Sequence, residues 1–268
     1  MSRRSGIEDQ TSLKEDVDVV TAKELAELLQ EAIADKTAEP TFFRALLDAS
    51  VYVHVPRIVH RDRVSFVQFT TPEGLTVLPF FSDDEQAKAA SGPSVAVAML
   101  TGRQLFSMTR GATLMLNPNQ TSCVLYPEEI SSLLDQGDVP VVERIDTGDQ
   151  TLLVGPANSS AAPLIERLIE MYARFNSIER AYVCEVRSAN ESEGPRFLIA
   201  AAVPAVDAEH AARATATEIH RHFEALETTV DFTAFDPASP PNWIIESGLE
   251  PFFIRDVGSH GTSSSSLH

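Results

Sequence analysis

Three acidic side chains in a row, at positions 83–85, are the first residues in this sequence that could do chemistry. Clustered carboxylates can bind a cation or exchange protons, and these directly follow an apolar pair at 80–81. The same stretch, Ser82 to Glu85, also matches a capping box, and carboxylates in a first turn complement the positive end of a helix. We therefore interpret the cluster as the beginning of a short helix that runs through Ala90.

Histidines and cysteines form no pattern typical of a metal site or a nucleophile. His220 and His222 lie two positions apart, roughly 200° around a helix, so they do not converge on one ion. Cys123 and Cys184 lie far apart in apolar, strand-like surroundings, where a thiol usually behaves as a small hydrophobe. The chain also lacks the GxSxG nucleophile motif and the GxxxxGK[ST] phosphate loop. The sequence thus predicts no catalytic residue, no metal site and no cofactor.

Polar residues around a predicted turn are the most distinctive candidates for binding. Arg103 and Arg110 lie near the ends of an expected helix over 101–109, and Asn117 begins the turn Asn-Pro-Asn that follows a short strand. This set could recognise an acidic partner. The alternative is that both arginines neutralise nearby carboxylates of an acidic chain, and the sequence leaves both interpretations open.

Two phenylalanine pairs, each preceded by a proline, complete the candidate surface. They are Phe80 with Phe81 and Phe252 with Phe253. Exposed apolar patches mark protein–protein sites, so we group these four residues with the polar set as a candidate protein-binding surface. Burial in a core is the competing interpretation for most of them.

Charge and composition narrow the class of partner. The 268 residues include 21 basic and 39 acidic side chains, a net charge of −18. Such a surface repels nucleic-acid phosphates and anionic lipid, so we expect neither nucleic acid nor membrane as a partner. The N-terminus lacks the apolar segment of a secretory signal, and the longest apolar run, 197–206, is too short to span a bilayer. With two widely separated cysteines, these features predict a cytoplasmic protein.

Periodicity divides the first half of the chain into alternating helices and strands. Thr21 to Glu24 form a capping box, and apolar residues then recur on one helical face. Further helices are expected over 41–48, 82–90, 101–109 and 127–137, and strands over 50–55, 64–70, 75–80, 94–98 and 113–116. This order predicts an α+β domain with a mixed sheet.

The second half has a simpler pattern. Strands are expected over 151–154, 178–186, 196–203 and 229–235, and helices over 163–175 and 207–226. The order β-α-β-β-α-β is that of a ferredoxin-like sandwich, which we predict for this half.

Composition sets the expected boundaries. The first residues are polar without periodicity, the stretch 138–150 is polar and ends in turn residues, and the end of the chain is rich in serine. We therefore expect a disordered arm over 1–18, an N-terminal domain over 19–140, a C-terminal domain over 148–256 and a disordered tail over 257–268.

Several sequence blocks, taken in order, resemble the SseB family (enhanced serine sensitivity protein B). They are TFFRALLDASVYV, VLPFFSDDE, RQLFSMTRGATLMLNPN, TLLVGPA, IERAYVC and a closing PFF, and the resemblance covers about residues 20 to 256. It implies a cytoplasmic bacterial protein with an N-terminal and a C-terminal family domain, and a connection to serine tolerance. It supplies no catalytic residues.

Three classes of function follow from these observations. The first is a non-enzymatic protein that binds another protein, as an adaptor does. The second is a regulatory protein that senses a small molecule such as an amino acid, since β-α-β-β-α-β modules also bind amino acids. The third is an enzyme whose catalytic groups meet only in space.

Overall fold

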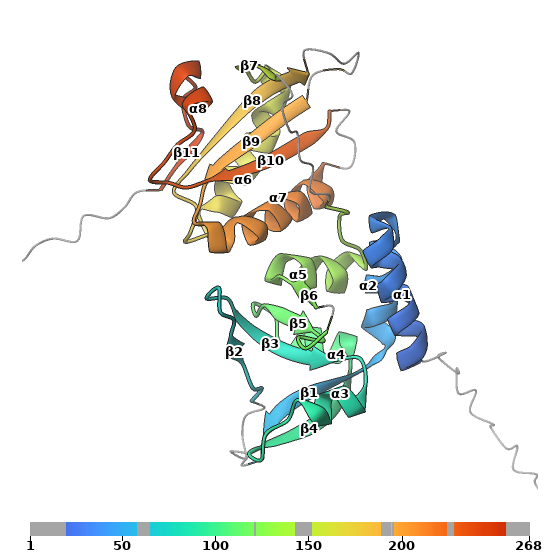
Figure 1. The fold of residues 1–268 in the computed structure, drawn as a ribbon. Helices are drawn as coiled ribbons and strands as arrows, with labels where there is room; N and C mark the ends of the chain where they lie inside the picture. The colour runs from blue at the N-terminus through green and yellow to red at the C-terminus, as the bar shows by residue number, and fades with distance from the viewer. Residues whose placement is uncertain are drawn as a thin grey trace, which may run out of the picture.

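The computed structural model describes residues 20–57, 65–120, 122–142, 152–188, 194, 196–223 and 228–255. These residues form two α/β units, each built around its own sheet and stacked end to end (Figure 1). The expected arm over 1–18, the tail over 257–268 and most of the expected boundary lie outside the described residues.

The N-terminal unit contains the predicted alternation of helices and strands. Its elements are α1 (Ala22–Ala34), α2 (Glu39–Asp48), β1 (Ser50–Pro56), β2 (Phe69–Thr70), β3 (Thr76–Phe81), α3 (Asp84–Ala89), β4 (Val95–Thr101), α4 (Gly102–Met108), β5 (Leu114–Leu116), β6 (Cys123–Leu125) and α5 (Pro127–Gln136). The short strand β6 was not predicted.

Strand pairing in this unit confirms the predicted mixed sheet. Among the described residues the order is β4-β1-β3-β5-β6, with β2 paired to β3. Strand β1 is antiparallel to both neighbours, whereas β3 and β5 run parallel. Helices α1, α2, α4 and α5 share the main core on one face. Helix α3 contacts β1 and β3, and there Nε2 of the buried His54 donates to the Ala87 carbonyl, 2.8 Å away.

Local capping signals place the helices nearly as predicted. Thr21 accepts from the Glu24 amide at 3.2 Å, and the Glu24 carboxylate accepts from the Thr21 amide at 2.8 Å, so this capping box is confirmed. Helix α3 begins one residue later than predicted, because Asp83 rather than Ser82 is its N-cap. The Asp83 carboxylate accepts from the Gln86 amide at 2.8 Å.

One glycine allows two helices of the N-terminal unit to touch. Gly102 begins α4 directly against the end of α2. A Cβ at this position would lie 2.0 Å from the Leu46 carbonyl oxygen, so no larger residue fits without moving the backbone. The close contact brings Leu105 and Phe106 into the core, where both are fully buried.

The first six elements of the C-terminal unit follow the predicted order, and the last two, a helix and a strand, were not predicted. The elements are β7 (Leu152–Pro156), α6 (Ala162–Tyr172), β8 (Arg180–Ser188), β9 (Arg196–Ala202), α7 (Ala208–His222), β10 (Val230–Phe235), α8 (Asn242–Ser247) and β11 (Phe253–Ile254). Together the two units confirm the α+β class.

The strand order, however, shows that the ferredoxin-like prediction for this unit is wrong. A split β-α-β unit places a third strand between two parallel strands. Here β9 and β10 pair directly in parallel, and β7 pairs antiparallel with β8. The path is β10-β9-β8-β11, with β7 on the same side of β8 as β11. The order of elements along the chain does not determine which strands become neighbours, because a helical connection can return the chain to either edge of a sheet.

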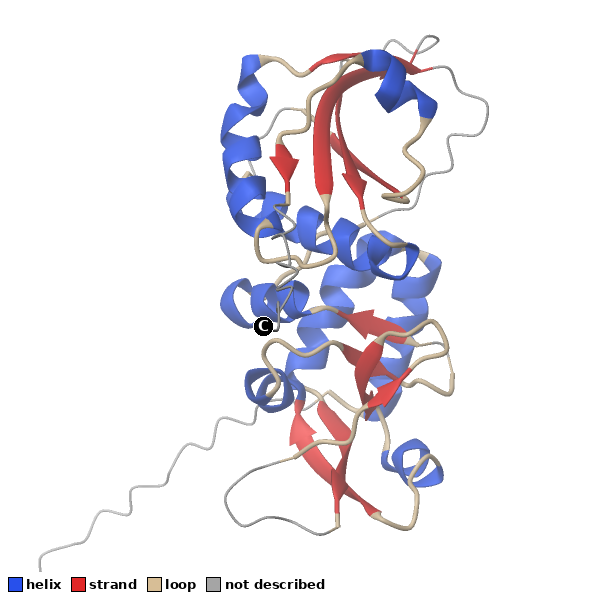
Figure 2. Cartoon of the chain, turned by 90° about the vertical axis from the view of Figure 1, so that its left-hand side faces the viewer, coloured by secondary structure: helices blue, strands red, loops and turns tan. Residues whose placement is uncertain are grey.

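Helices cover both faces of the C-terminal sheet (Figure 2). On one face α6 and α7 enclose a core that includes Leu168, Tyr172 and Ile199. On the other face α8 packs over Tyr182 and Ala200. In the described part of the chain, no helix combines the length and apolarity needed to cross a bilayer.

Candidate functional site at the domain junction

The phenylalanines of the candidate surface lie inside the two cores. Phe80 and Phe81 are 0% and 1% exposed, and Phe253 is 8% exposed. Phe252 is partly buried and packs against the same core as Phe253. Strand β3 lies within the sheet with helices on both faces, so alternate side chains such as Phe80 and Phe81 are buried in turn. The prediction that these residues form an exposed surface is therefore wrong.

Asn117 is also internal, so its assignment to the surface is wrong. It is 4% exposed and has a backbone φ of 47°, in the left-handed region where asparagine is tolerated. Its side chain accepts from the Ser82 amide at 3.0 Å and donates to the Ser82 hydroxyl at 3.0 Å. Asn117 thus connects the turn after β5 to the end of β3.

Replacing Asn117 by Ala is expected to lower the free energy of unfolding by about 1–3 kcal/mol, because the Ser82 amide loses a buried acceptor. Asn119, in the same turn, is exposed, and Asn119→Ala is the matched control. Urea denaturation of the two variants and the unchanged protein measures the difference. Equal stabilities of the two variants would contradict a structural role for the Asn117 side chain.

Both arginines of the candidate surface face carboxylates. Arg103 lies 3.5 Å from Asp48, and Arg110 lies 3.0 Å from Asp135, with about half of each arginine side chain exposed. The structure therefore agrees with the interpretation that they neutralise local acidic groups. Asp135, the partner of Arg110, lies at the junction between the two units and also pairs with Arg221.

At this junction, α5 of the N-terminal unit packs against α7 of the C-terminal unit. Two aspartates there each contact one basic side chain from each unit. Asp135 pairs with Arg110 at 3.0 Å and with Arg221 of α7 at 3.1 Å. Asp138, just after α5, lies 4.0 Å from Arg44 and 3.9 Å from His220.

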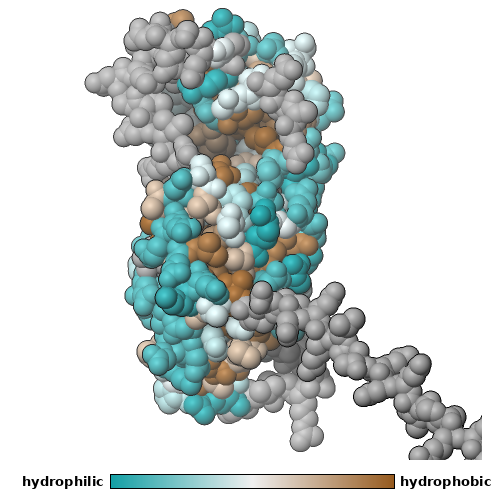
Figure 3. All heavy atoms as spheres, turned by 90° about the vertical axis from the view of Figure 1, so that its right-hand side faces the viewer, coloured by the Kyte–Doolittle hydropathy of each residue, from teal (hydrophilic) through white to brown (hydrophobic). Residues whose placement is uncertain are grey.

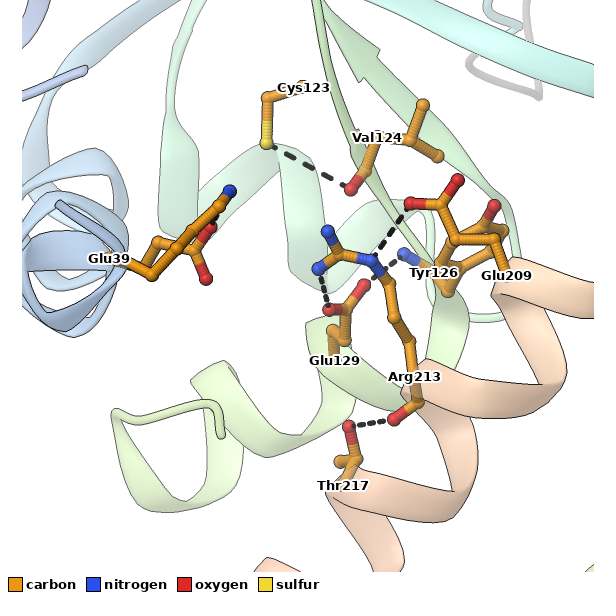
Figure 4. Close-up of polar contacts among 9 residues, drawn as sticks. Glu39, Cys123, Val124, Tyr126, Glu129, Glu209, Arg213 and Thr217 are labelled. Atoms are coloured by element: carbon orange, nitrogen blue, oxygen red, sulfur yellow. Dashed lines mark hydrogen bonds and ion pairs between the residues drawn. The ribbon is translucent and has the colours of Figure 1, made fainter. Parts of the chain in front are cut away.

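A buried ion pair forms the centre of the junction (Figure 4). Glu129 and Arg213, whose side chains are 1% and 16% exposed, are joined by a bond of 2.9 Å. The other Glu129 oxygen accepts from the Tyr126 amide at 2.9 Å, and Arg213 also donates to Glu209 at 3.1 Å. Glu129 therefore caps α5 and binds α7 with the same carboxylate.

Aromatic stacking adds a second contact between the units. His210 of α7 stacks on Tyr126, with ring centroids 4.4 Å apart and planes 6° from parallel. His210 also contacts Phe175, with centroids 4.6 Å apart and the rings tilted by 54°. Its Nε2 lies 2.8 Å from a carboxylate oxygen of Glu128. The three histidines of α7 thus have different partners, since His220 faces Asp138 and His222 faces Glu218 at 3.4 Å.

Burial shifts the protonation equilibria of the junction. It raises the pKa of the Glu129 carboxyl, and the attraction of Arg213 opposes that rise. Burial by itself lowers the pKa of Arg213, but Glu129 reverses the effect and raises it, so the guanidinium stays charged. Desolvation raises the pKa of the nearby Cys123 thiol to about 12. At neutral pH Cys123 is therefore a protonated thiol. The ion pair of Glu129 and Arg213 stays charged and holds the two units together.

A second buried carboxylate lies in the same region. Glu39 of α2 is 6% exposed, and one of its oxygens accepts from the Lys36 ammonium at 2.6 Å. Its other oxygen is buried without a hydrogen-bond partner in the described part of the structure. Figure 4 shows Glu39 approaching the region of Cys123 from the opposite side to Arg213.

Comparison with known families explains the two-part architecture. The SseB protein N-terminal domain matches residues 25–132, and the SseB protein C-terminal domain matches residues 145–255. The chain belongs to the SseB family. The resemblance found in the sequence is thereby confirmed, and α5 and α7 bring the two SseB domains into contact.

Individual SseB proteins share moderate identity with this chain. Protein SseB of Escherichia coli (strain K12) is 29% identical over 186 residues, which cover 67% of this chain and 72% of that protein. Protein SseB of Shigella flexneri matches to the same extent. No solved structure shows a significant match.

An open pocket of about 300 Å³ lies beside the SseB domain junction. Its described lining is mostly apolar and includes Ile219 of α7, Phe223 just after α7, Pro140 and Val230. His220 also lines it and is charged when protonated. Polar residues cover most of the surrounding face, with apolar residues gathered in a hollow in its upper part (Figure 3).

Sequence reasoning missed the junction residues. Glu129 is the third residue of a helix that begins at Pro127, so a carboxylate there is fully explained as a cap. Arg213 lies 84 positions further along the chain, on the polar side of an ordinary amphipathic helix. A buried partner for either residue leaves no signal in a single sequence.

Proposed function

We propose that this SseB-family protein is a non-enzymatic protein-binding or adaptor protein of the cytoplasm, with a role connected to serine tolerance. The observation that carries the proposal is the domain junction, in which Glu129 pairs with Arg213 and His210 stacks on Tyr126. Domains within one chain usually move relative to each other unless their interface is large and apolar. Here charged and stacked contacts hold the two SseB domains in one arrangement.

A fixed arrangement suits an adaptor because a partner can then contact both domains at once. The buried ion pair of Glu129 and Arg213 is costly to separate, since one charge would stay buried without the other. The domains therefore present a combined surface without an ordering cost on binding, which favours affinity.

The remaining features support the same proposal. The net charge of −18 disfavours nucleic acid and anionic lipid as partners. Burial raises the pKa of the Cys184 thiol to about 11 and that of Cys123 to about 12, so both are protonated at neutral pH. Unpaired cysteines suit a reducing compartment such as the cytoplasm.

The amino-acid sensor alternative rested on the ferredoxin-like topology and on the serine phenotype after which the family is named. The topological support is lost because β9 and β10 pair directly and β7 pairs with β8. The phenotype by itself identifies no amino-acid site, so we favour the adaptor proposal.

Affinity purification of the tagged full-length chain from its source cells is expected to recover a stoichiometric protein partner. Hydrogen–deuterium exchange of the purified complex should then show protection in both SseB domains. Recovery of no stoichiometric partner under several growth conditions would contradict the proposal, and protection in one domain alone would contradict the adaptor arrangement.

A matched pair of variants tests the role of the junction in that complex. Arg221→Gln removes an ion pair between the domains, whereas Arg187→Gln removes a pair with Glu185 within the C-terminal domain. A single exposed pair contributes at most about 1 kcal/mol, so Arg221→Gln should weaken partner binding about two- to fivefold and Arg187→Gln should not. Equal losses of partner affinity in both variants would contradict a role of the domain junction in partner binding.

A further inference from the structure

Strand β4 is an edge strand without the usual protection. It is seven residues long and pairs with β1 along its whole length. Residues 89–102, which contain it, include no charged side chain. Met99, next to its central residue, is 64% exposed. A long, regular and apolar edge is a template for pairing with another strand.

The other edges in the described residues are protected in recognised ways. Strand β6 has three residues, and β2 and β11 have two each. Strand β7 ends in Gly155-Pro156, and proline on an edge blocks further pairing. Strand β10 carries Asp231, which pairs with Arg196 at 3.5 Å. Strand β4 alone among them combines length, regularity and lack of charge.

The hydrogen bonds of β4 show which of its backbone groups face outward. Arg57 donates its amide to the Ser94 carbonyl, and Gly102 donates to the Ala49 carbonyl. The backbone amide and carbonyl groups of the even-numbered residues from 94 to 102 are therefore directed toward β1, because the backbone groups of successive residues in a strand face opposite sides. The odd-numbered residues Val97 and Met99 direct their amide and carbonyl groups away from the sheet.

Both ends of this outer edge are already occupied. The Val95 amide donates to the Gly92 carbonyl at 3.1 Å, and the Val95 carbonyl accepts from the Arg57 side chain at 3.0 Å. The Thr101 amide donates to the Gln104 side chain at 3.0 Å, and Thr101 is the N-cap of α4. Within the described residues, the unfilled outward groups are those of Val97 and Met99.

We propose that β4 pairs antiparallel with β4 of a second copy of this chain, forming a two-fold symmetric dimer. A two-fold axis at Ala98 places Val97 opposite Met99 of the second copy, and Met99 opposite Val97. In an antiparallel sheet such residues exchange both backbone hydrogen bonds. The amide and carbonyl groups of Val97 and Met99 make four free backbone groups per chain, and in this register each of them forms a hydrogen bond with the second copy.

The side chains of β4 and its position in the molecule are compatible with a second copy of the chain pairing along this edge. Val97 and Met99 share one face of the strand, so each would pack on the other across the axis, while Ala98 meets Ala98 on the opposite face with little bulk. A two-fold contact uses the same patch on both chains, as most dimers do. Strand β4 lies at the end of the molecule opposite the C-terminal domain, so the second copy would extend away from it (Figure 1).

Light scattering after size exclusion tests the dimer in the full-length chain. The unchanged protein is expected at twice the 29.2 kDa chain mass. Met99→Lys puts a charge on each side of the axis and should give the monomer mass. Met108→Lys is the matched control, because Met108 is 48% exposed on α4, away from the edge, and it should remain a dimer.

Val97→Pro is an independent second variant. It removes an outward amide but no bond to β1, so a folded monomer is expected, with circular dichroism as the check on folding. A monomeric unchanged protein at micromolar concentration, or a dimer that survives both edge variants, would overturn the proposal. The dimer does not depend on the proposed adaptor function, since a monomer that still captures a protein partner would overturn the dimer alone.

Discussion

Replacing Arg213 by Met is expected to lower the free energy of unfolding by about 3–5 kcal/mol, because Glu129 would remain as an uncompensated buried charge. The Glu129 side chain is 1% exposed and is held from α7 by the Arg213 guanidinium at 2.9 Å. The stem of Met fills part of the space that the arginine stem occupies, so loss of charge rather than of volume dominates. Urea denaturation followed by circular dichroism measures the change.

A double variant separates charge from packing. Glu129→Gln keeps an oxygen that can accept from the Tyr126 amide, which Glu129 now bonds at 2.9 Å, but removes the charge. The double variant Glu129→Gln with Arg213→Met should therefore be more stable than Arg213→Met alone. A double variant that is less stable than Arg213→Met would show that the buried charge is not the cause.

The loss of unfolding free energy in Arg213→Met should also depend on pH. Burial raises the pKa of the Glu129 carboxyl above its ordinary value of 4.5, and without Arg213 the hydrogen bond from the Tyr126 amide is the main influence left to oppose that rise. A raised folded-state pKa means that the folded protein holds the proton more tightly, so stability falls as pH rises through the window above 4.5. The deficit should thus be largest at neutral pH and shrink on acidification toward pH 4.5. A deficit that is constant over this range would contradict the electrostatic explanation.

Replacing Phe80 by Ala is expected to cost about 3–5 kcal/mol of unfolding free energy, as truncation of a buried phenylalanine usually does. Phe80 is 0% exposed and contacts Phe106 edge to face, with centroids 6.1 Å apart. The lost ring would leave a cavity between β3 and the helices of the main core.

A phenylalanine near the surface provides the control for this variant. Phe69 on β2 is 37% exposed, so Phe69→Ala should change the stability much less. Thermal and urea unfolding of both variants measure the comparison. A Phe80→Ala variant as stable as Phe69→Ala would restore the interpretation of Phe80 as a surface residue.

Local features of this protein could be predicted from its sequence because they depend on nearby residues. The Thr21–Glu24 capping box and the turn at Gly137, with φ of 76°, involve groups within one helical turn. Apolar periodicity placed the helices to within a few residues, since it reflects which face of each helix meets a core. The ordered family blocks identified both SseB domains.

Tertiary structure alone decided the remaining features, because they join residues distant in the chain. The side chains of Phe80 and Phe81 could equally have faced solvent until helices covered both faces of β3. The strand order in the C-terminal sheet depends on which edge of β8 each later strand reaches. The ion pair of Glu129 and Arg213 links positions 84 residues apart. It forms because the packing of α5 on α7 brings the two side chains together and excludes water from them.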